Sequence, residues 1–241
     1  MQENININNI LFIDLETVPV CKNFKELPDA LKPLWEHKVQ RIKKEDETKT
    51  TEELFFEKAG IYSEFGKIIC VSAGFFRPES NGLTFRVKAF YSDNEKTILQ
   101  ELCKLLESHY NTKSHFLCAH NGKEFDFPYL SRRLLINNIK LPYLLDNAGK
   151  KPWETPFLDT MELWKFGDIK NYTSLALLAA VFGIPSPKDD IDGSQVADVY
   201  YNKGQLERIA KYCNKDVITT ARLYLKLTQQ GEISEDQVNI I

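Results

Sequence analysis

The sequence has few residues from which a disulfide framework or a zinc site could be built. It contains five cysteines and four histidines in 241 residues, and no two cysteines stand in C-x-x-C spacing. An odd number of unclustered cysteines is typical of a protein in a reducing compartment. The composition therefore argues against both kinds of site, and we expect a cytoplasmic protein.

Long apolar runs are also missing. No stretch approaches the ~18 apolar residues of a membrane-spanning helix, and the start, MQENININN, lacks the charged and apolar regions of a signal peptide. We therefore expect no signal peptide, no transmembrane segment and no membrane partner.

The chain has no excess of basic residues, since its formal net charge is −3. A strong basic footprint marks many proteins that bind duplex nucleic acid tightly without sequence preference, so the composition argues against that class. Two short basic clusters, Arg41 with Lys43 and Lys44 and Arg132 with Arg133, could follow a phosphate backbone or could be solvated faces.

The apolar pattern predicts a single α/β domain over residues 1–241. A chain of this length with 43% hydrophobic residues can bury one sizeable core. A polar segment over roughly residues 21–65 follows the first strand, and we interpret it as a helical insertion. Its predicted packing face comprises Leu31, Leu34, Trp35 and Val39.

The rest of the chain alternates between strand and helix patterns. We expect strands at 10–13, 67–76, 84–91 and 114–119, a helix at 94–110, and helices from residue 159 onward. This order predicts a mixed sheet flanked by helices.

Two carboxylates, Asp14 and Glu16, directly follow the first apolar run. Residues i and i+2 of a strand share a face and lie about 6–7 Å apart, so both carboxylates point to the same side. Two hard oxygen donors on one face make half of a Mg²⁺ site. An isolated D-x-E is more often a solvated pair at a strand end, so the remaining motifs decide between the two interpretations.

Two further acidic motifs follow in order. The first, HNGKEFD, ends at Asp126. Asp126 could cap the next helix or bind a metal ion, and one residue could do both. The second places Tyr212 and Asp216 at i and i+4 on an amphipathic helix. Without the other motifs, Tyr212 would be interpreted as a half-buried helix tyrosine. The inner side of that helix is predicted to carry Ile209, Val217, Ala221 and Leu225.

Taken in order, D-x-E, N-x-x-x-F-D and Y-x-x-x-D resemble the motifs of DEDDy-type 3′–5′ exonucleases, including the proofreading domain of family-B DNA polymerases. The stretch PWETPFLDTMELWKFGDIKNYTSLALLAAVFGIPSPKDDIDGSQV is more similar still to a stand-alone bacterial family of predicted polymerase-B-like 3′–5′ exonucleases. The resemblance spans roughly residues 9–228 and implies a ribonuclease-H-like fold.

The resemblance implies that Asp14, Glu16, Asp126 and Asp216 hold two Mg²⁺ or Mn²⁺ ions. Asp14 then bridges both ions, Glu16 and Asp216 hold the ion on the side of the attacking water, and Asp126 holds the second. Hard oxygen ligands independently suit these ions.

Tyr212 is the fifth catalytic residue that the resemblance implies. Other members of the superfamily carry a histidine five residues before the last aspartate, where this chain has Lys211. A phenol with an ordinary pKa of about 10 is a poor base at neutral pH, so we expect Tyr212 to orient the attacking water.

We expect substrate contacts from four residues near the motifs. Asn121 and Phe125 are predicted to touch the terminal nucleotides, since an aromatic face stacks on any base, and Leu15 and Thr17 to line the 3′-end pocket. His120 is expected to be structural. The role of Asp159 stays open between support of the metal ligands and support of the fold.

The function expected from the resemblance is metal-dependent 3′–5′ hydrolysis of single-stranded nucleic acid, DNA favoured, to nucleoside 5′-monophosphates by a two-metal mechanism. The alternatives are a 3′–5′ exoribonuclease and a catalytically silent nucleic-acid-binding module of the same fold. Little chain follows Asp216, so we expect any polymerase or repair partner to act in trans.

Overall fold

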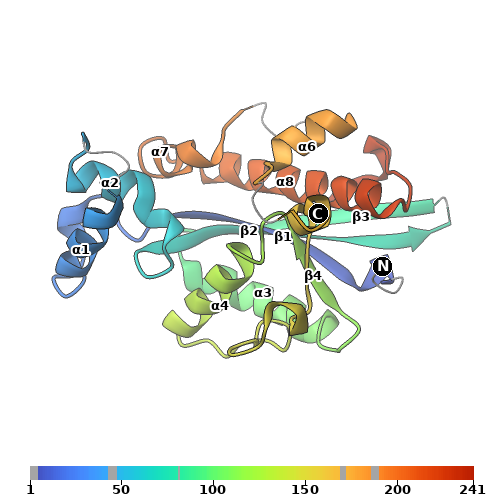
Figure 1. Ribbon diagram of the computed structural model, residues 1–241, viewed down its shortest axis with the longest axis horizontal. Coiled ribbons are helices and arrows are strands. Elements are labelled where there is room, and N and C mark those ends of the chain that lie inside the picture. The colour runs from blue at the N-terminus through green and yellow to red at the C-terminus, as the bar shows by residue number, and fades with distance from the viewer. Residues whose placement is uncertain (1–4, 43–47, 81, 169–171, 186–189) are drawn as a thin grey trace.

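The fold is built on a mixed sheet, seen in a computed structural model that describes residues 5–42, 48–80, 82–168, 172–185 and 190–241. Lys43 and Lys44 of the first basic cluster lie outside these residues. The described residues form a six-stranded sheet in the order β5-β4-β1-β2-β3-β6 (Figure 1). Its strands are β1 (Ile10–Pro19), β2 (Gly66–Glu79), β3 (Gly82–Tyr91), β4 (Phe116–Ala119), β5 (Phe157–Asp159) and β6 (Val238–Ile240).

Strand direction changes across the sheet. β1 runs antiparallel to β2, and β2 antiparallel to β3, whereas β4 runs parallel to β1 and β5 parallel to β4. β6 adds to the far edge, parallel to β3. The mixed sheet flanked by helices is therefore confirmed. The prediction of helices alone from residue 159 onward is wrong for β6, because three residues are too few to show an alternating pattern.

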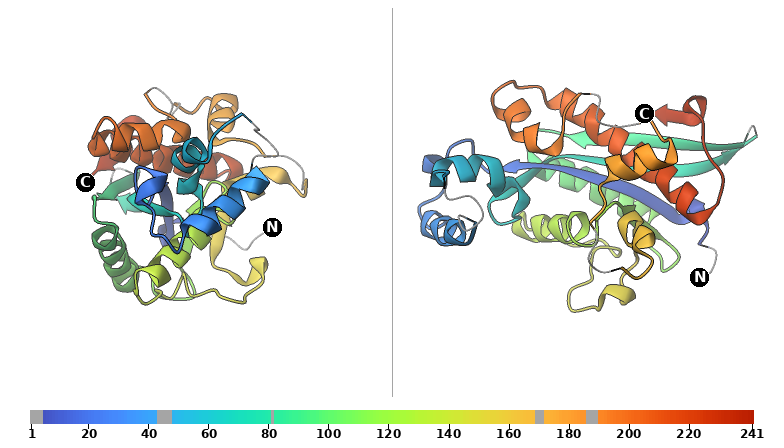
Figure 2. Two further views of the ribbon diagram at one scale, coloured as in Figure 1. Left: turned by 90° about the vertical axis from the view of Figure 1, so that its left-hand side faces the viewer. Right: turned by 45° about the horizontal axis from the view of Figure 1, so that its top comes forward.

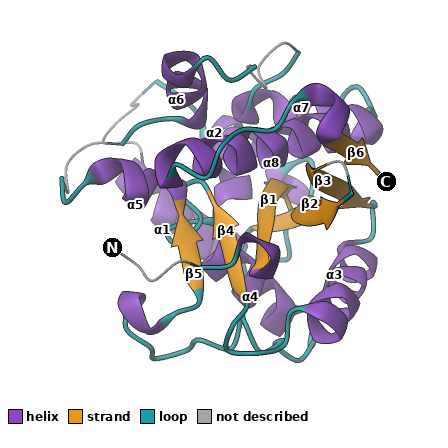
Figure 3. Ribbon diagram, turned by 90° about the vertical axis from the view of Figure 1, so that its right-hand side faces the viewer, coloured by secondary structure: helices purple, strands orange, loops and turns teal. Residues whose placement is uncertain are grey.

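Helices cover both faces of the sheet (Figure 3). α3 and α4 pack on one face, and the long helix α8 packs on the other, with α6 and α7 beside it. The helices are α1 (Lys32–Ile42), α2 (Thr51–Lys58), α3 (Glu95–His109), α4 (Asp126–Ile136), α5 (Thr160–Lys165), α6 (Leu175–Phe182), α7 (Val196–Tyr201) and α8 (Leu206–Thr228). No helix in the described part of the chain combines the length and apolar character that a membrane crossing needs.

The side chains of β1 divide between these two faces. Leu11 and Ile13 pack in the cluster with α3 and α4. Ile10 and Phe12 pack on the opposite side, where Phe12 meets Tyr224 of α8 edge to face with ring centroids 5.5 Å apart. Because side chains alternate along a strand, the even-numbered residues that follow Phe12 also face α8.

The segment after β1 is a helical insertion, as predicted. α1 and α2 lie together at one end of the molecule (Figure 2) and share a core of their own around Trp35, Val39 and Phe55. The predicted packing face is wrong at Leu34, whose side chain is 58% exposed. The rest of that face is buried or partly buried in the same core.

The insertion is fixed to the sheet by a close backbone contact. A Cβ atom on Gly60 would lie 3.1 Å from the backbone of Val18, so only glycine fits there without displacement of β1. The hydroxyl of Tyr129, from α4, donates a hydrogen bond to the Gly60 carbonyl at 2.8 Å. These contacts place the end of the insertion directly beside the end of β1.

Candidate active site

Asp14 and Glu16 lie within β1 on the face covered by α8. The parallel ladder with β4 ends at Phe12 opposite Cys118, so β1 continues past β4 and leaves one edge open. The antiparallel ladder with β2 continues, with a register shift between Glu16 and Thr17. The two carboxylates therefore sit where the sheet opens, on a strand held from one side only.

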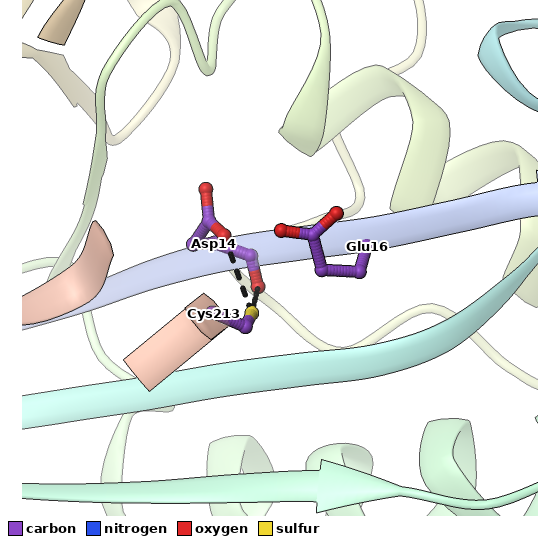
Figure 4. Close-up of side chains that lie close together, drawn as sticks. All are labelled: Asp14, Glu16 and Cys213. Atoms are coloured by element: carbon purple, nitrogen blue, oxygen red, sulfur yellow. Dashed lines mark hydrogen bonds between the residues drawn. The ribbon is translucent and has the colours of Figure 1, made fainter. Parts of the chain in front are cut away.

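A third side chain joins this pair (Figure 4). Asp14, Glu16 and Cys213 offer potential ligand atoms that all lie within 4.8 Å of one another. The Cys213 thiol donates to Asp14 Oδ2 at 3.2 Å. Burial raises the pKa of this thiol well above its ordinary value, and nearby Cys70 and the two carboxylates add to the shift. Cys213 therefore stays neutral and steadies Asp14, while the carboxylates supply the negative charge.

Asp126 approaches the open edge of β1 from α4. It is 5% exposed and is the first residue of that helix, and its carboxylate accepts hydrogen bonds from its own backbone and from that of Leu15. The residue before it, Phe125, occupies the cap position and makes no capping hydrogen bond with its side chain. The cap alternative for Asp126 is therefore wrong, because the helix begins at Asp126 itself.

Asp159 holds the loop that delivers Asp126. Its carboxylate accepts from the backbone N–H groups of Asn121 at 2.9 Å and Lys123 at 3.1 Å, and it caps α5 by accepting from Met161 at 2.9 Å. Asn121 adopts the left-handed conformation with φ of 62°, which this turn requires. Asp159 thus supports the fold of the site through its neighbours.

Tyr212 and Asp216 project from consecutive turns of α8. The Tyr212 hydroxyl donates to the Asp216 carboxylate, the i, i+4 contact that the spacing predicts. Lys211, by contrast, points to solvent and pairs with Glu207 at 2.9 Å. All four predicted inner residues of the helix, Ile209, Val217, Ala221 and Leu225, are buried.

One pocket of about 380 Å³ collects every predicted site residue. These residues are Asp14, Leu15, Glu16, Thr17, Asn121, Phe125, Asp126, Tyr212 and Asp216. No Lys or Arg side chain is among the described residues that line it. Their roles in binding and catalysis remain predictions, but segments from β1, α4 and α8 do meet in one cleft.

Several other walls of this cleft were not predicted from the sequence. The insertion contributes Phe56, Glu57, Gly60 and Ile61, and the segment before α7 contributes Ser194. Nothing in the pattern of residues 21–65 indicates that they reach the cleft, because this depends on the tertiary contact of Gly60 with β1. Cys213 could have been found, since it shares a helix face with Tyr212 and Asp216.

The cleft carboxylates are held in an unfavourable electrostatic environment. Burial is the first cause that raises the pKa of Asp14 and Glu16 well above ordinary values, followed by repulsion from neighbouring carboxylates. Burial likewise raises the pKa of Asp126 to about 7. Burial and the nearby acids raise the pKa of Tyr212, so its phenol stays protonated at neutral pH. A divalent cation would relieve these penalties, so the donor set fits hard cations.

His120 has a structural role, as expected. Its Nδ1 lies 2.9 Å from Thr160 Oγ1 and its Nε2 lies 2.8 Å from the Thr173 carbonyl, so both ring nitrogens are occupied. Burial lowers the pKa of this imidazole. Arg133, considered as a phosphate contact, is also structural, because its guanidinium is buried against Glu95.

The fold and the cleft define a ribonuclease-H-like α/β domain with an acidic pocket at the open end of its first strand. Residues 61–240 match the family described as a predicted 3′-5′ exonuclease related to the exonuclease domain of PolB, and the chain belongs to this family. The match begins at Ile61, near the end of the insertion, so Asp14 and Glu16 precede it.

Similar proteins are archaeal DNA polymerases. DNA polymerase 1 of Pyrococcus abyssi is 26% identical over 142 residues, which cover 54% of this chain and 18% of the polymerase. The DNA polymerase of Pyrococcus glycovorans is 28% identical over 119 residues, covering 44% and 15%. The structure of the family B DNA polymerase from Pyrobaculum calidifontis matches with a TM-score of 0.54 and 16% identity, covering 91% of this chain and 24% of that one. The chain thus spans less than a quarter of these proteins, and the last likeness concerns the fold.

Proposed function

We propose that this protein is a 3′–5′ exonuclease that releases nucleoside 5′-monophosphates from single-stranded nucleic acid, DNA favoured. One observation supports the proposal above the others. Carboxylates from three separate motifs, together with Tyr212, line one pocket, and no Lys or Arg is among the described residues of its wall. Burial and mutual repulsion of these acids are costly unless cations bind there.

Asp14, Glu16, Asp126 and Asp216 would hold two Mg²⁺ or Mn²⁺ ions, with Asp14 between them. When bound, such ions would lower the pKa of the attacking water and stabilise charge on the leaving 3′ oxygen. Zn²⁺ coordination by Cys213 would have to displace a proton from a thiol whose pKa is raised by burial, whereas the carboxylate oxygens suit Mg²⁺ or Mn²⁺ directly.

The remaining groups would position the substrate and the attacking water. The Tyr212 hydroxyl donates a hydrogen bond to Asp216 and stays protonated, so it would orient water through its oxygen lone pairs and would not act as a base. The side-chain oxygen of Asn121 is buried beside the cleft without a hydrogen-bond partner. A donor on the terminal nucleotide would satisfy it, and Phe125 offers an aromatic face to the base.

The direct test uses matched single-stranded DNA and RNA oligonucleotides labelled at the 5′ end. With Mg²⁺ or Mn²⁺ we expect a ladder shortened from the 3′ end and free 5′-monophosphates, faster on DNA. Excess EDTA should stop the reaction. Undiminished digestion in chelator would contradict the metal requirement, and faster digestion of RNA would assign the exoribonuclease alternative.

A second test separates catalysis from binding. If the wild-type chain binds the labelled strand but releases no mononucleotide under any of these conditions, the protein is a binding module and the proposed activity is wrong. Any polymerase or repair factor acting with it in trans remains part of the proposal.

A further inference from the structure

A second hollow, of about 710 Å³, lies on the insertion between α1 and the turn at Ala59–Ile61. We call it the insertion groove. Its wall carries three Lys or Arg side chains, Lys38, Arg41 and Lys58, and a single acid, Glu64. The balance of charge is the reverse of that in the cleft, where acids occur without a described Lys or Arg.

The basic side chains of this groove are available to a ligand. Arg41 and Lys58 are exposed, and neither forms an ion pair with a described residue. Lys38 lies over the ring of Tyr62, with its Nζ 3.7 Å from the ring centroid. By comparison, Lys123, in the turn before α4, pairs with Glu162. Within the described part of the chain, the insertion groove therefore presents positive charge at Arg41 and Lys58 that no acid pairs with.

The groove also exposes apolar surface beside those charges. Leu34 is 58% exposed and Ile61 is 51% exposed, and both line the groove. Apolar and aromatic surface next to basic side chains suits single-stranded nucleic acid, whose bases and phosphates are both accessible. A role in this groove would explain why Leu34, on the expected packing face of α1, is exposed.

The groove and the cleft share one wall residue. Ile61 lines both, and the preceding residue, Gly60, is held against the backbone of Val18 at the end of β1. The insertion, at one end of the molecule in Figure 2, is thus fixed beside the end of β1, where Gly60 and Ile61 line the cleft. A strand whose 3′ end enters the acidic cleft can continue along this wall.

We propose that the insertion groove binds the single strand upstream of its 3′ end, with phosphates at Arg41, Lys58 and Lys38. Bases would lie against Leu34, Ile61 and the Tyr62 ring. This inference rests on the proposed exonuclease function and assigns the insertion a part in substrate binding. On this proposal, the acids of the cleft would hold the cations at the scissile bond. The basic residues of the insertion groove would hold the strand upstream of that bond.

The test compares a long substrate with one that fills only the cleft. We take the ratio of kcat/KM on a 15-mer to kcat/KM on a dinucleotide, in Mg²⁺, for the double variant Arg41→Glu/Lys58→Glu. The ratio should fall about tenfold or more. The slope of log(kcat/KM) on the 15-mer against log salt should weaken by ~1.4, from two lost phosphate contacts at about 0.7 each.

The matched control is Lys96→Glu/Lys104→Glu, which makes the same charge change on α3, outside both hollows. It should keep the wild-type ratio. An unchanged ratio in the Arg41/Lys58 variant would overturn the proposal. Arg132 and Lys150 line a different pocket, beside α4. A fall of the kcat/KM ratio in Arg132→Glu/Lys150→Glu, with no fall in the Arg41/Lys58 variant, would also overturn the proposal.

The failure of the exonuclease function would look different, because the wild-type chain would then cleave neither substrate. In that case the anisotropy of a fluorescent 15-mer decides the matter. Weaker binding by the Arg41/Lys58 variant than by the control supports the groove, and equal binding overturns it.

Discussion

Buried carboxylates occur in two regions of this protein with opposite surroundings. Glu95 on α3 is 8% exposed, and Glu16 and Asp126 in the cleft are 7% and 5% exposed. Glu95 accepts hydrogen bonds from Arg133 Nε at 2.8 Å and from the Ile68 backbone at 2.7 Å. Asp14, Glu16 and Asp126 form no ion pair with any described residue, and the pKa values of Asp14 and Glu16 are raised further by repulsion from neighbouring carboxylates.

The difference shows which acids stabilise the fold and which do not. A buried acid with a buried guanidinium is compensated, and loss of either partner leaves an isolated charge. Buried acids that repel one another lower the stability of the metal-free chain. The first arrangement is structural, whereas the second is useful only where a cation supplies the missing charge.

The largest effect should follow from loss of the central cleft carboxylate. Asp14→Asn keeps the shape of the side chain but removes its charge, so we expect single-turnover activity to fall at least ~10⁴-fold. Unfolding in urea without metal should show equal or greater stability. Asp146→Asn, at an exposed loop position outside the cleft, is the control. Near-normal activity of Asp14→Asn would remove the basis of the assignment.

The opposite pattern is expected at Glu95. Glu95→Gln leaves Arg133 buried without its carboxylate, so the free energy of unfolding should fall by about 3–5 kcal/mol. Activity per folded molecule should be retained at low temperature. Glu101→Gln, exposed on the same helix, controls for helix position. If Glu95→Gln is as stable as this control, the claim that Glu95 stabilises the fold while the cleft acids do not is wrong.

The third prediction concerns pH in the absence of metal. Burial raises the pKa of Asp126 to about 7 in the folded chain, above its value of 3.8 as an isolated group. The folded state therefore binds more protons between these values, and stability falls as pH rises through this window. We expect wild type to lose on the order of 2–4 kcal/mol relative to Asp126→Asn between pH 4 and pH 7.5, in EDTA. Parallel profiles for the two proteins would contradict the shift.

The smallest effect is expected at Tyr212. Tyr212→Phe removes a hydroxyl that orients water but leaves the carboxylates in place, so kcat should fall about 10²-fold with little change in KM. Tyr224→Phe, on the same helix but packed against Phe12, should remain near wild type. Should Tyr212→Phe be as inactive as Asp14→Asn while still binding metal, the hydroxyl does more than orient water.

The local parts of the site could be predicted from the sequence. Two carboxylates at i and i+2 on a strand, and Tyr212 with Asp216 at i and i+4 on a helix, follow from the periodicity of each element. The mixed sheet followed from the order of strand and helix patterns and from the family resemblance. These features depend on residues close together in the chain.

The features that were missed depend on residues far apart. Gly60 beside Val18, and the reach of Ile61 into the cleft, are tertiary contacts that no local pattern records. Leu34 was misassigned because an apolar residue at helical spacing is ordinarily buried, and here it faces a groove. β6 was missed because its pairing with β3, across the chain, decides its conformation.

The most direct test of the central claim is Mn²⁺ binding, measured by calorimetry or electron paramagnetic resonance on the metal-free chain at pH 7.5. The claim is that the clustered, mutually repelling acids of the cleft form a cation site. Wild type and Glu95→Gln should both bind Mn²⁺, whereas Asp14→Asn, although folded and at least as stable, should lose that binding. Equal Mn²⁺ binding by wild type and Asp14→Asn, or none by wild type, would contradict the account.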